Sequence, residues 1–353
     1  MIEGKKNIVN FSDFHAHAFM DFSKPDYLYV NDRFSEQIQV LQEVFDYARS
    51  HDADVLFNGD LFHKRGVVDV RIFNHVYDMF LAYSDLNIIM VRGNHDSVNN
   101  SIKSASVLEP FESMEHVTII SEMEMVETTY YRVYGVAYGD EVKEQKEWIS
   151  KQATSLPTDK VNILCAHIGV NGAKTGKYSH TLEGAFSIAD LWTDAFDIVT
   201  LGHYHKRQFL GDRKNVFYVG NTMQTSFADE GQDKGFYFIQ LDGGKTTEWK
   251  MDFVKTTYRP FLTVTAEDAP EDMSNMFVQF VGTPAEAKAV IEIKEKEKLD
   301  NIRVTVQKDY STKPRIDISA GSTPEQVVRA YTTKNNPKLE DKALECLREA
   351  MEV

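Results

Sequence analysis

The chain has 353 residues, of which 42% are hydrophobic and 26% charged, so it can bury a large core and has an ordinary soluble globular composition. Its formal net charge of −15 argues against a protein that grips nucleic acid with its own surface, because phosphate contacts come from Lys and Arg. No run approaches the roughly 20 apolar residues of a membrane span, and two cysteines, Cys165 and Cys346, argue against a disulfide framework and fit a reducing cytosol.

The first predicted strand, residues 8–11, ends at two ligand-type side chains. Asp13 and His15 follow it almost at once. In an extended backbone, side chains two residues apart share a face, so both can point at the same ion. Apolar residues then recur at helical spacing over residues 33–49, which predicts an amphipathic helix.

Two more predicted strands end in the same way. The apolar run Val55-Leu56-Phe57 stops at Asn58-Gly59-Asp60, and His63 follows three residues later. After a second amphipathic helix, with its apolar face from Ile72 to Tyr83, the strand 87–91 ends in Arg92-Gly93-Asn94-His95-Asp96. Strands joined through helices indicate βαβ organisation, with the chemistry at the carboxyl ends of the strands.

From about residue 117 the pattern changes to strands with fewer helices between them. Two of these strands again end in ligand-type residues, one in His167 and one in His203 and His205. We expect an α/β (α+β) fold in which two packed sheets form a central sandwich with helices outside. The predicted strands are 117–120, 130–137, 161–166, 196–201, 216–219 and 235–241, and one helix is predicted over 140–152.

The ligand-type residues run out near residue 258, where we place the end of the first domain, 1–258. Residues 259–320 are predicted to form a small α+β capping domain, with strands 261–265, 276–281 and 302–306 and a charged helix from 284 to 298. Residues 321–353 are predicted to form two helices, since Thr323-Pro324 is a helix-start signal and Pro337 breaks the helix that follows.

The strand ends together supply a donor set for metal ions. Imidazole and carboxylate donors suit Mn, Fe or Zn better than Ca. There are too many ligands for one ion and about enough for two, and a carboxylate, here Asp60, can bridge cations roughly 3.5–4 Å apart. Such a pair polarises phosphoryl oxygens and lowers the pKa of a shared water. Beside it, Asn94 is a neutral oxygen ligand, and His95 is placed to stabilise charge or protonate a leaving oxygen.

The motifs Asp-x-His, Gly-Asp, Gly-Asn-His-Asp, a lone strand-end His and Gly-His-x-His, in this order, resemble those of the calcineurin-like metallophosphoesterases. Gly59-Asp60-Leu61-Phe62-His63 is similar to the SbcD-type nuclease of double-strand-break repair, including bacteriophage recombination versions. The Asp-Arg-Gly continuation of the protein serine/threonine phosphatases is absent, and Ala16-His17 replaces the Leu-Gly common in SbcD-like chains. The resemblance implies a four-layer sandwich of two mixed β-sheets flanked by helices, with a capping domain and C-terminal helices.

The resemblance also implies a role for each motif residue. One metal is assigned to Asp13, His15, Asp60 and His205. The other is assigned to Asp60, Asn94, His167 and His203. By the same resemblance His95 is the catalytic histidine and His63 a substrate- or phosphate-facing helper, and the alternative for His63 is a cap of the segment that follows it. The two divalent ions are expected to be Mn²⁺, with Mg²⁺, Fe or Zn as the alternatives.

The family resemblance implies a manganese-dependent 3′–5′ exonuclease and endonuclease, a subunit of a recombination or repair complex. Its expected partners are DNA and a coiled-coil ABC ATPase of the SbcC type, docked on the apolar face Leu344, Leu347 and Met351. A homodimer in a two-plus-two complex is expected, in bacterial or infected-host cytoplasm and not on a membrane. The partner and the bound cations would then attract the DNA despite the net charge.

Two alternatives stay open. In the first, the same site belongs to a small-molecule or cyclic-nucleotide phosphodiesterase. In the second, the fold is a non-catalytic scaffold for an ATPase. A scaffold would be expected to have lost metal ligands, and all seven ligand positions still carry ligand-type residues. Lys174 and Lys177 are open between phosphate contact and a solvated loop, and Arg92 is open between phosphate contact and structural pairing. The remaining histidines have no motif around them and are predicted to be surface or packing residues: His17, His51, His75, His116 and His180.

Overall fold

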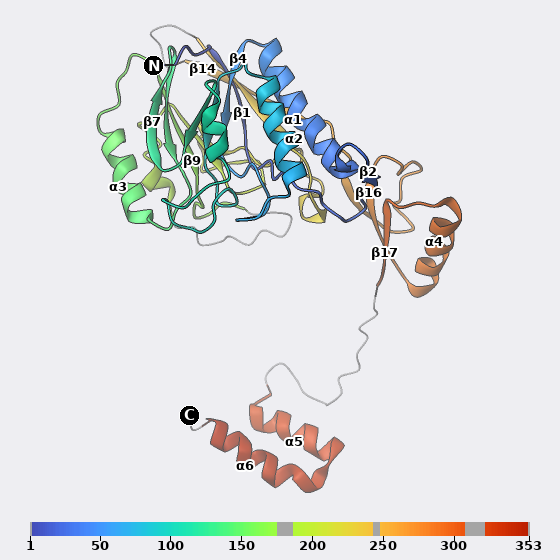
Figure 1. Cartoon of the computed structure of the whole chain (residues 1–353). Helices are drawn as coiled ribbons and strands as arrows, with labels where there is room; N and C mark the ends of the chain where they lie inside the picture. Colours follow the sequence, from blue (N-terminus) through green and yellow to red (C-terminus); the bar gives the residue numbers. More distant parts are fainter. Residues whose placement is uncertain (1, 175–185, 243–247, 308–321, 352–353) are drawn as a thin grey trace. The chain divides into compact units, whose positions relative to one another are not determined.

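A computed structural model describes residues 2–174, 186–242, 248–307 and 322–351 (Figure 1). The chain divides into two compact units, Met1–Thr305 and Val306–Val353, and each is described by itself. In the first unit two six-stranded sheets pack together, with helices on their outer faces. The predicted mixed α/β fold is therefore confirmed.

The first sheet carries the βαβ units expected at the N-terminal end of the chain. Its strands run in the order β14-β13-β1-β4-β5-β6, with β1, β4, β5 and β6 parallel to one another, β13 antiparallel to β1, and β14 antiparallel to β13. The strand bounds are β1 Asn7–Phe11, β4 Ala53–Phe57, β5 Ile88–Val91, β6 Val117–Ile120, β13 Gly235–Leu241 and β14 Trp249–Lys255.

Two helices cover the outer face of this sheet. They are α1 (Asp32–Ser50) and α2 (Val70–Ala82), and their apolar stripes pack with the sheet in one core cluster. Each helix begins at a capping residue that satisfies a backbone N–H: the Asn31 side chain accepts from Phe34 at 2.9 Å, and that of Asp69 accepts from Arg71 at 2.9 Å. A short ribbon of β2 (Pro25–Asp26) and β3 (Val30–Asn31) precedes α1.

The second sheet has the order β11-β12-β10-β9-β8-β7. Its central strands β8, β9, β10 and β12 are parallel, and short antiparallel strands close both edges. The strand bounds are β7 Met123–Glu127, β8 Tyr131–Val136, β9 Val161–His167, β10 Ile198–Gly202, β11 Gln208–Phe209 and β12 Val216–Tyr218. On its outer side lie α3 (Val142–Ala153) and η2 (Ile188–Leu191), whereas η1 (Glu109–Ser113) packs beside β6 of the first sheet and η3 (Phe227–Asp229) packs on Phe261.

The core between the two sheets explains why most strands read as continuous apolar runs. Ile8 and Leu56 of the first sheet pack in one cluster with Ile163 and Phe217 of the second, and all four are 0% exposed. Strands buried on both faces need apolar residues at every position. The edge strands β7 and β14 were not predicted, because half or more of their residues are at least partly exposed and their charged side chains break the apolar run.

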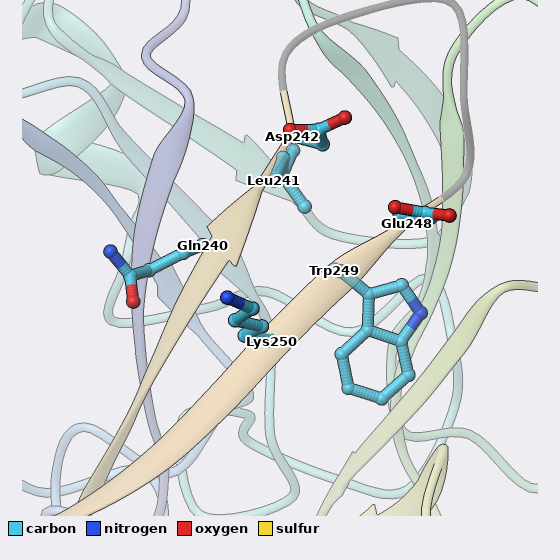
Figure 2. Close-up of a pocket in the computed structure, with 6 residues that line it drawn as sticks. All are labelled: Gln240, Leu241, Asp242, Glu248, Trp249 and Lys250. Carbon is cyan, nitrogen blue, oxygen red and sulfur yellow. The ribbon is translucent and has the colours of Figure 1, made fainter.

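A cavity of about 550 Å³ opens at the ends of β13 and β14 (Figure 2). It is lined by Gln240, Leu241, Asp242, Glu248, Trp249 and Lys250. None of these belongs to the predicted site. The cavity therefore marks the end of a β-hairpin and not the predicted active site.

A three-stranded sheet follows residue 258, in the order β15-β16-β17 (Phe261–Val264, Phe277–Gly282, Ile302–Val306), with α4 (Pro284–Glu297) against it. Arg33 of α1 joins this sheet to the main sandwich. Its guanidinium carbon lies 5.2 Å from the ring centroid of Phe261 and 5.0 Å from that of Phe277. Arg33 as a whole is only 2% exposed. The domain boundaries given above stay a prediction.

The second unit contains a pair of helices, as predicted from the capping signal at Thr323. Its elements are α5 (Pro324–Asn335), the short η4 (Pro337–Leu339) and α6 (Glu340–Met351). Leu344 is buried within this unit, whereas Met351 is 66% exposed. None of the helices in the described parts of the chain combines the length and apolar character that a bilayer crossing requires.

Candidate dimetal centre

The predicted ligands follow five strands whose carboxyl ends meet at one edge of the sandwich. The loop after β1 runs beside the loop after β4, since the Asp13 N–H donates to the Gly59 carbonyl at 2.9 Å and the His15 N–H to that of Asp60 at 3.0 Å. The residues that the structure brings to this edge are Asp13, His15, Asp60, His63, Asn94, His95, His167, His203 and His205.

The first half of the centre is formed by Asp13, His15 and His205, which can offer ligand atoms within 4.8 Å of one another. His15 Nε2 lies 2.9 Å from His205 Nε2 and 4.0 Å from Asp13 Oδ1. Two ring nitrogens that face each other at this distance share at most one proton. Their lone pairs therefore suit a common cation, and His15 is 2% exposed.

The second half is formed around Asn94. Its Oδ1 lies 3.0 Å from His167 Nε2 and 3.0 Å from His203 Nδ1. Asp60 connects the halves, because its Oδ2 lies 3.3 Å from His167 Nε2 and 3.7 Å from His15 Nε2. Its other oxygen, Oδ1, accepts the His95 N–H at 2.7 Å. One carboxylate oxygen is thus held by the backbone and the other faces both groups of donors.

Backbone strain is concentrated on these residues. Asp13, His15, Asp60 and His203 have φ values of 51°, 51°, 62° and 100°. They are four of the nine non-glycine residues with positive φ in the described parts of the chain. Such conformations are unfavourable and persist where the surroundings enforce them, often at functional sites. Gly59, at φ 97°, is required here, because a Cβ would collide with the ring of His167.

Asp96 holds the turn that carries Asp60. Its carboxylate accepts four backbone N–H groups: Oδ2 from Asp60 at 2.9 Å and Gly93 at 3.0 Å, and Oδ1 from Leu61 at 2.9 Å and Phe62 at 3.2 Å. Asp96 is 2% exposed. It lies in the Gly-Asn-His-Asp motif, yet sequence reasoning assigned it no role, since a spacing does not tell which carboxylate faces an ion and which faces a turn.

A closed ring of buried polar side chains joins the two sheets beneath the centre. Asn10 donates to Asn58 Oδ1 at 2.7 Å, Asn58 to Thr200 Oγ1 at 2.7 Å, and Thr200 to Asn10 Oδ1 at 2.5 Å. The Asn58 carbonyl accepts from His167 Nδ1 at 2.6 Å. Since that bond places the proton on Nδ1, it leaves His167 Nε2 to face Asn94 and Asp60.

The electrostatics of the cluster fit divalent cations. Burial disfavours charge on His15 and lowers its pKa well below the ordinary value, and burial followed by the charge of His167 lowers the pKa of His203 to about 3. Burial also opposes charge on His167, but Asp60 outweighs it and raises the pKa of His167 to about 9. Without a bound cation, the negative charge of the buried carboxylates is therefore balanced by a proton on His167. A divalent cation would supply that positive charge in place of the proton.

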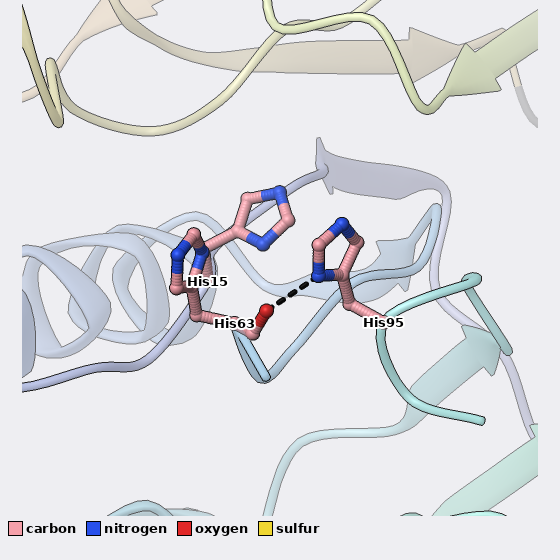
Figure 3. Close-up of side chains that lie close together, drawn as sticks. All are labelled: His15, His63 and His95. Carbon is pink, nitrogen blue, oxygen red and sulfur yellow. Dashed lines mark hydrogen bonds between the residues drawn. The ribbon is translucent and has the colours of Figure 1, made fainter. Parts of the chain in front are cut away.

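His95 and His63 are partly exposed and lie beside the buried His15, with ring centroids 4.8 Å and 5.4 Å from that of His15; Figure 3 shows the three side chains together. His95 Nδ1 donates a hydrogen bond to the backbone carbonyl of His63, and their rings stack with centroids 5.7 Å apart. His63 also contacts His17 and Phe19, with ring centroids at 5.1 Å and 5.0 Å. His17 is thus a packing residue, as predicted, but it packs on a residue of the candidate site.

The structure decides the role of one of the three basic residues that the sequence allowed to contact phosphate. Arg92 is 0% exposed and donates to the carbonyls of Ser121, Ile102 and Tyr138 at 2.9, 2.9 and 3.0 Å, so its role is structural. Lys174 is exposed, and its backbone exchanges two hydrogen bonds with Gln208. Lys177, like His180, lies outside the described residues.

A family model described as calcineurin-like phosphoesterase matches residues 6–207, which include all seven proposed ligands. The chain belongs to the calcineurin-like phosphoesterase family. Membership implies divalent ions at a dimetal site, and the donors gathered at the strand ends fit two of them. Asp13, His15, Asp60 and His205 would hold one ion, and Asp60, Asn94, His167 and His203 the other.

This calcineurin-like phosphoesterase is 27% identical over 207 residues to the uncharacterized metallophosphoesterase YhaO of Bacillus subtilis (strain 168), with 56% of this chain and 47% of that protein covered. The chain thus spans about half the length of this curated relative. Two solved structures are also similar. A dimetal phosphatase from Danio rerio is 10% identical at a TM-score of 0.41, covering 71% of this chain and 99% of that one. YfkN from Bacillus subtilis is 15% identical at 0.38, covering 71% and 89%.

Proposed function

We propose that the chain is a metal-dependent DNA nuclease of the SbcD type, which hydrolyses phosphodiester bonds as a 3′–5′ exonuclease and endonuclease with two Mn²⁺ ions. The observation that carries the proposal is the position of His63. Sequence similarity to SbcD-type chains rests on the continuation Leu61-Phe62-His63, and His63 lies against His95 beside the donor cluster.

The residues themselves account for binding and proton handling. When bound, two divalent cations would neutralise phosphoryl charge and acidify water for in-line attack. The His63 carbonyl fixes the ring of His95, which leaves His95 Nε2 without a hydrogen bond among the described residues. Once the ring also carries a proton on Nε2, that N–H stabilises the negative charge of the transition state or gives its proton to the leaving oxygen, whereas the neutral ring, with its proton on Nδ1, has no proton to give there.

Partners complete the proposal, because the net charge of −15 opposes unaided DNA binding. We propose a coiled-coil ABC ATPase as the partner, docked on the C-terminal helices, and a homodimer within a two-plus-two complex in the cytoplasm. The exposed Met351 and Leu339, at 66% and 51%, give α6 and η4 apolar surface for such docking.

The decisive experiment incubates the purified full-length chain with Mn²⁺ and a panel of substrates. The panel contains linear duplex, hairpin and single-stranded DNA, a cyclic nucleotide and bis-p-nitrophenyl phosphate. Asp60→Ala removes the bridging carboxylate, and His51→Ala, at an exposed histidine outside the centre, is the matched control. Cleavage of DNA that Asp60→Ala abolishes and His51→Ala retains supports the proposal.

The other outcomes select between the alternatives. Hydrolysis of only the cyclic nucleotide or the small diester identifies a small-molecule phosphodiesterase. No hydrolysis of any substrate, with and without a coiled-coil ATPase, together with less than one ion per chain, identifies a scaffold. Either result refutes the nuclease assignment.

A further inference from the structure

Arg65 lies two residues after His63, on the surface beside the candidate dimetal centre. It has two partners in the described parts of the chain: Nη1 donates to Asn100 Oδ1, and the guanidinium stands over the ring of Tyr138, with Cζ 5.9 Å from the centroid. Neither partner is charged. Among the described residues Arg65 therefore carries an uncompensated positive charge, although the chain as a whole has an excess of acidic residues.

Tyr138 connects this cation to the second half of the centre. Its ring centroid lies 5.5 Å from that of His203, at an interplanar angle of 36°. The same ring lies 6.3 Å from that of His167. The ring of Tyr138 thus lies between Arg65 and the half of the centre formed by Asn94, His167 and His203.

The partners of Arg65 are fixed from behind by the backbone. The buried Arg92 donates to the Tyr138 carbonyl at 3.0 Å, and the Tyr138 N–H donates back to the Arg92 carbonyl at 3.1 Å. The Asp140 N–H donates to the Asn100 carbonyl at 2.9 Å. Because both partners are held in one frame, the guanidinium is ordered before a ligand arrives, which lowers the entropic cost of binding.

Arg71 is an exposed arginine whose charge, unlike that of Arg65, has an acidic partner. It lies near the start of α2 and forms an ion pair with Asp69 at 2.6 Å, so its charge is balanced. Arg65 has a planar fork with donors left over after its single bond to Asn100. A guanidinium in this state matches the geometry and charge of a phosphate group.

We propose that Arg65, positioned by Asn100 and Tyr138, binds a non-bridging oxygen of the phosphate next to the scissile one. The site then favours chains with at least two successive phosphodiesters over a lone diester. This inference rests on the proposed nuclease function and names the substrate feature that the site reads: a neighbouring phosphate, independent of base sequence.

The test compares two substrates with Mn²⁺ present: a dinucleoside monophosphate, which has one phosphodiester, and a single-stranded hexanucleotide without terminal phosphates. Arg65→Ala is expected to raise KM for the hexanucleotide about tenfold, the loss of one charge-assisted contact. Its effect on the dinucleotide is expected to be several-fold smaller. The slope of log KM against log salt concentration for the hexanucleotide should decrease by about 1, the change expected for the loss of one phosphate contact.

Two further variants make the result specific. Arg65→Lys keeps the charge but loses the fork and should fall between wild type and Arg65→Ala. Tyr138→Leu removes the ring that orients the guanidinium and should raise KM for the hexanucleotide with an unchanged salt slope. Arg71→Ala is the matched control, with both substrates expected at wild-type values.

Equal fold-changes on both substrates, or an equal effect of Arg71→Ala, overturn the inference and leave the nuclease function standing. Absence of cleavage of both substrates by the wild-type chain, with duplex and hairpin DNA also left intact, refutes the nuclease function itself, and the inference with it. A thermal melting curve of each variant that matches the wild type excludes misfolding as the cause of a loss.

Discussion

The backbone carbonyl of His63 accepts a hydrogen bond from Nδ1 of His95 (Figure 3). A carbonyl only accepts, so the proton lies on Nδ1 and the lone pair of the neutral ring lies on Nε2. A residue of the β4 loop therefore sets the tautomer of a residue of the β5 loop. The two loops also meet at Asp60, whose Oδ1 accepts the His95 N–H at 2.7 Å.

Replacement of His95 should separate catalysis from metal binding. We expect His95→Ala to lower kcat on a phosphodiester by about 10²- to 10⁴-fold, the range of general acid catalysis. The ions should stay, because none of the seven proposed ligands is altered. Metal content per chain and kcat are the measurements, and the exposed His51→Ala is the control. Loss of the ions together with the rate would show that His95 is a ligand instead.

Substitutions at Asp60 and at Asp13 should differ in how many metal ions the protein loses. Asp60 Oδ2 faces both halves of the centre, 3.7 Å from His15 and 3.3 Å from His167, whereas Asp13 lies with His15 and His205. We expect Asp60→Asn to lose both ions and Asp13→Asn to lose about one of two, measured by elemental analysis after desalting. Equal losses in the two variants would contradict the proposed bridge.

Asp96 should matter for stability even without metal. Asp96→Ala leaves four buried N–H groups without their acceptor, so we expect a loss of at least about 3 kcal/mol in the free energy of unfolding. The control is Asp85→Ala, at an exposed ion pair with Arg49, for which we expect about 0–1 kcal/mol. Urea unfolding of metal-free protein measures both. A loss for Asp96→Ala no larger than that of the control would remove its positioning role.

Asp54 should make stability depend on pH. It is 0% exposed and accepts from Tyr131 at 2.8 Å and from Asn87 at 3.0 Å, and burial raises its pKa above the ordinary value despite these bonds. The folded state then binds the proton more tightly than the unfolded state. This contribution to stability is complete below the unfolded pKa of about 4 and is lost as the pH rises through the raised folded pKa.

We therefore expect the difference in melting temperature between wild type and Asp54→Asn to shrink as the pH rises from about 4 towards 7. The difference between the two chains isolates this group from the other titrating carboxyls. Melting curves at matched ionic strength measure it. A difference that grows over the same interval would mean that the hydrogen bonds to Asp54 outweigh its burial.

Much of the fold could be predicted because the sandwich buries its strands on both faces. Residues such as Ile8, Leu56 and Ile163 lie in continuous apolar runs, and the polar residues that end those runs mark the strand ends. The edge strands β7 and β14 could not be predicted in the same way. Their exposed side chains are under no such constraint, so partners along the backbone, not the residue pattern, make them strands.

The chain by itself determined the chemistry of the centre. Carboxylate, amide and imidazole groups occur directly after strands, and the geometry of parallel sheets brings such positions to one edge. Only the tertiary structure decided how each group is used. Asp60 and Asp96 are both aspartates in loops after strands, yet one faces the histidines and the other accepts four backbone N–H groups. The reason is physical: residue type sets which bonds a side chain can make, and the packing of distant segments sets which partners are within reach.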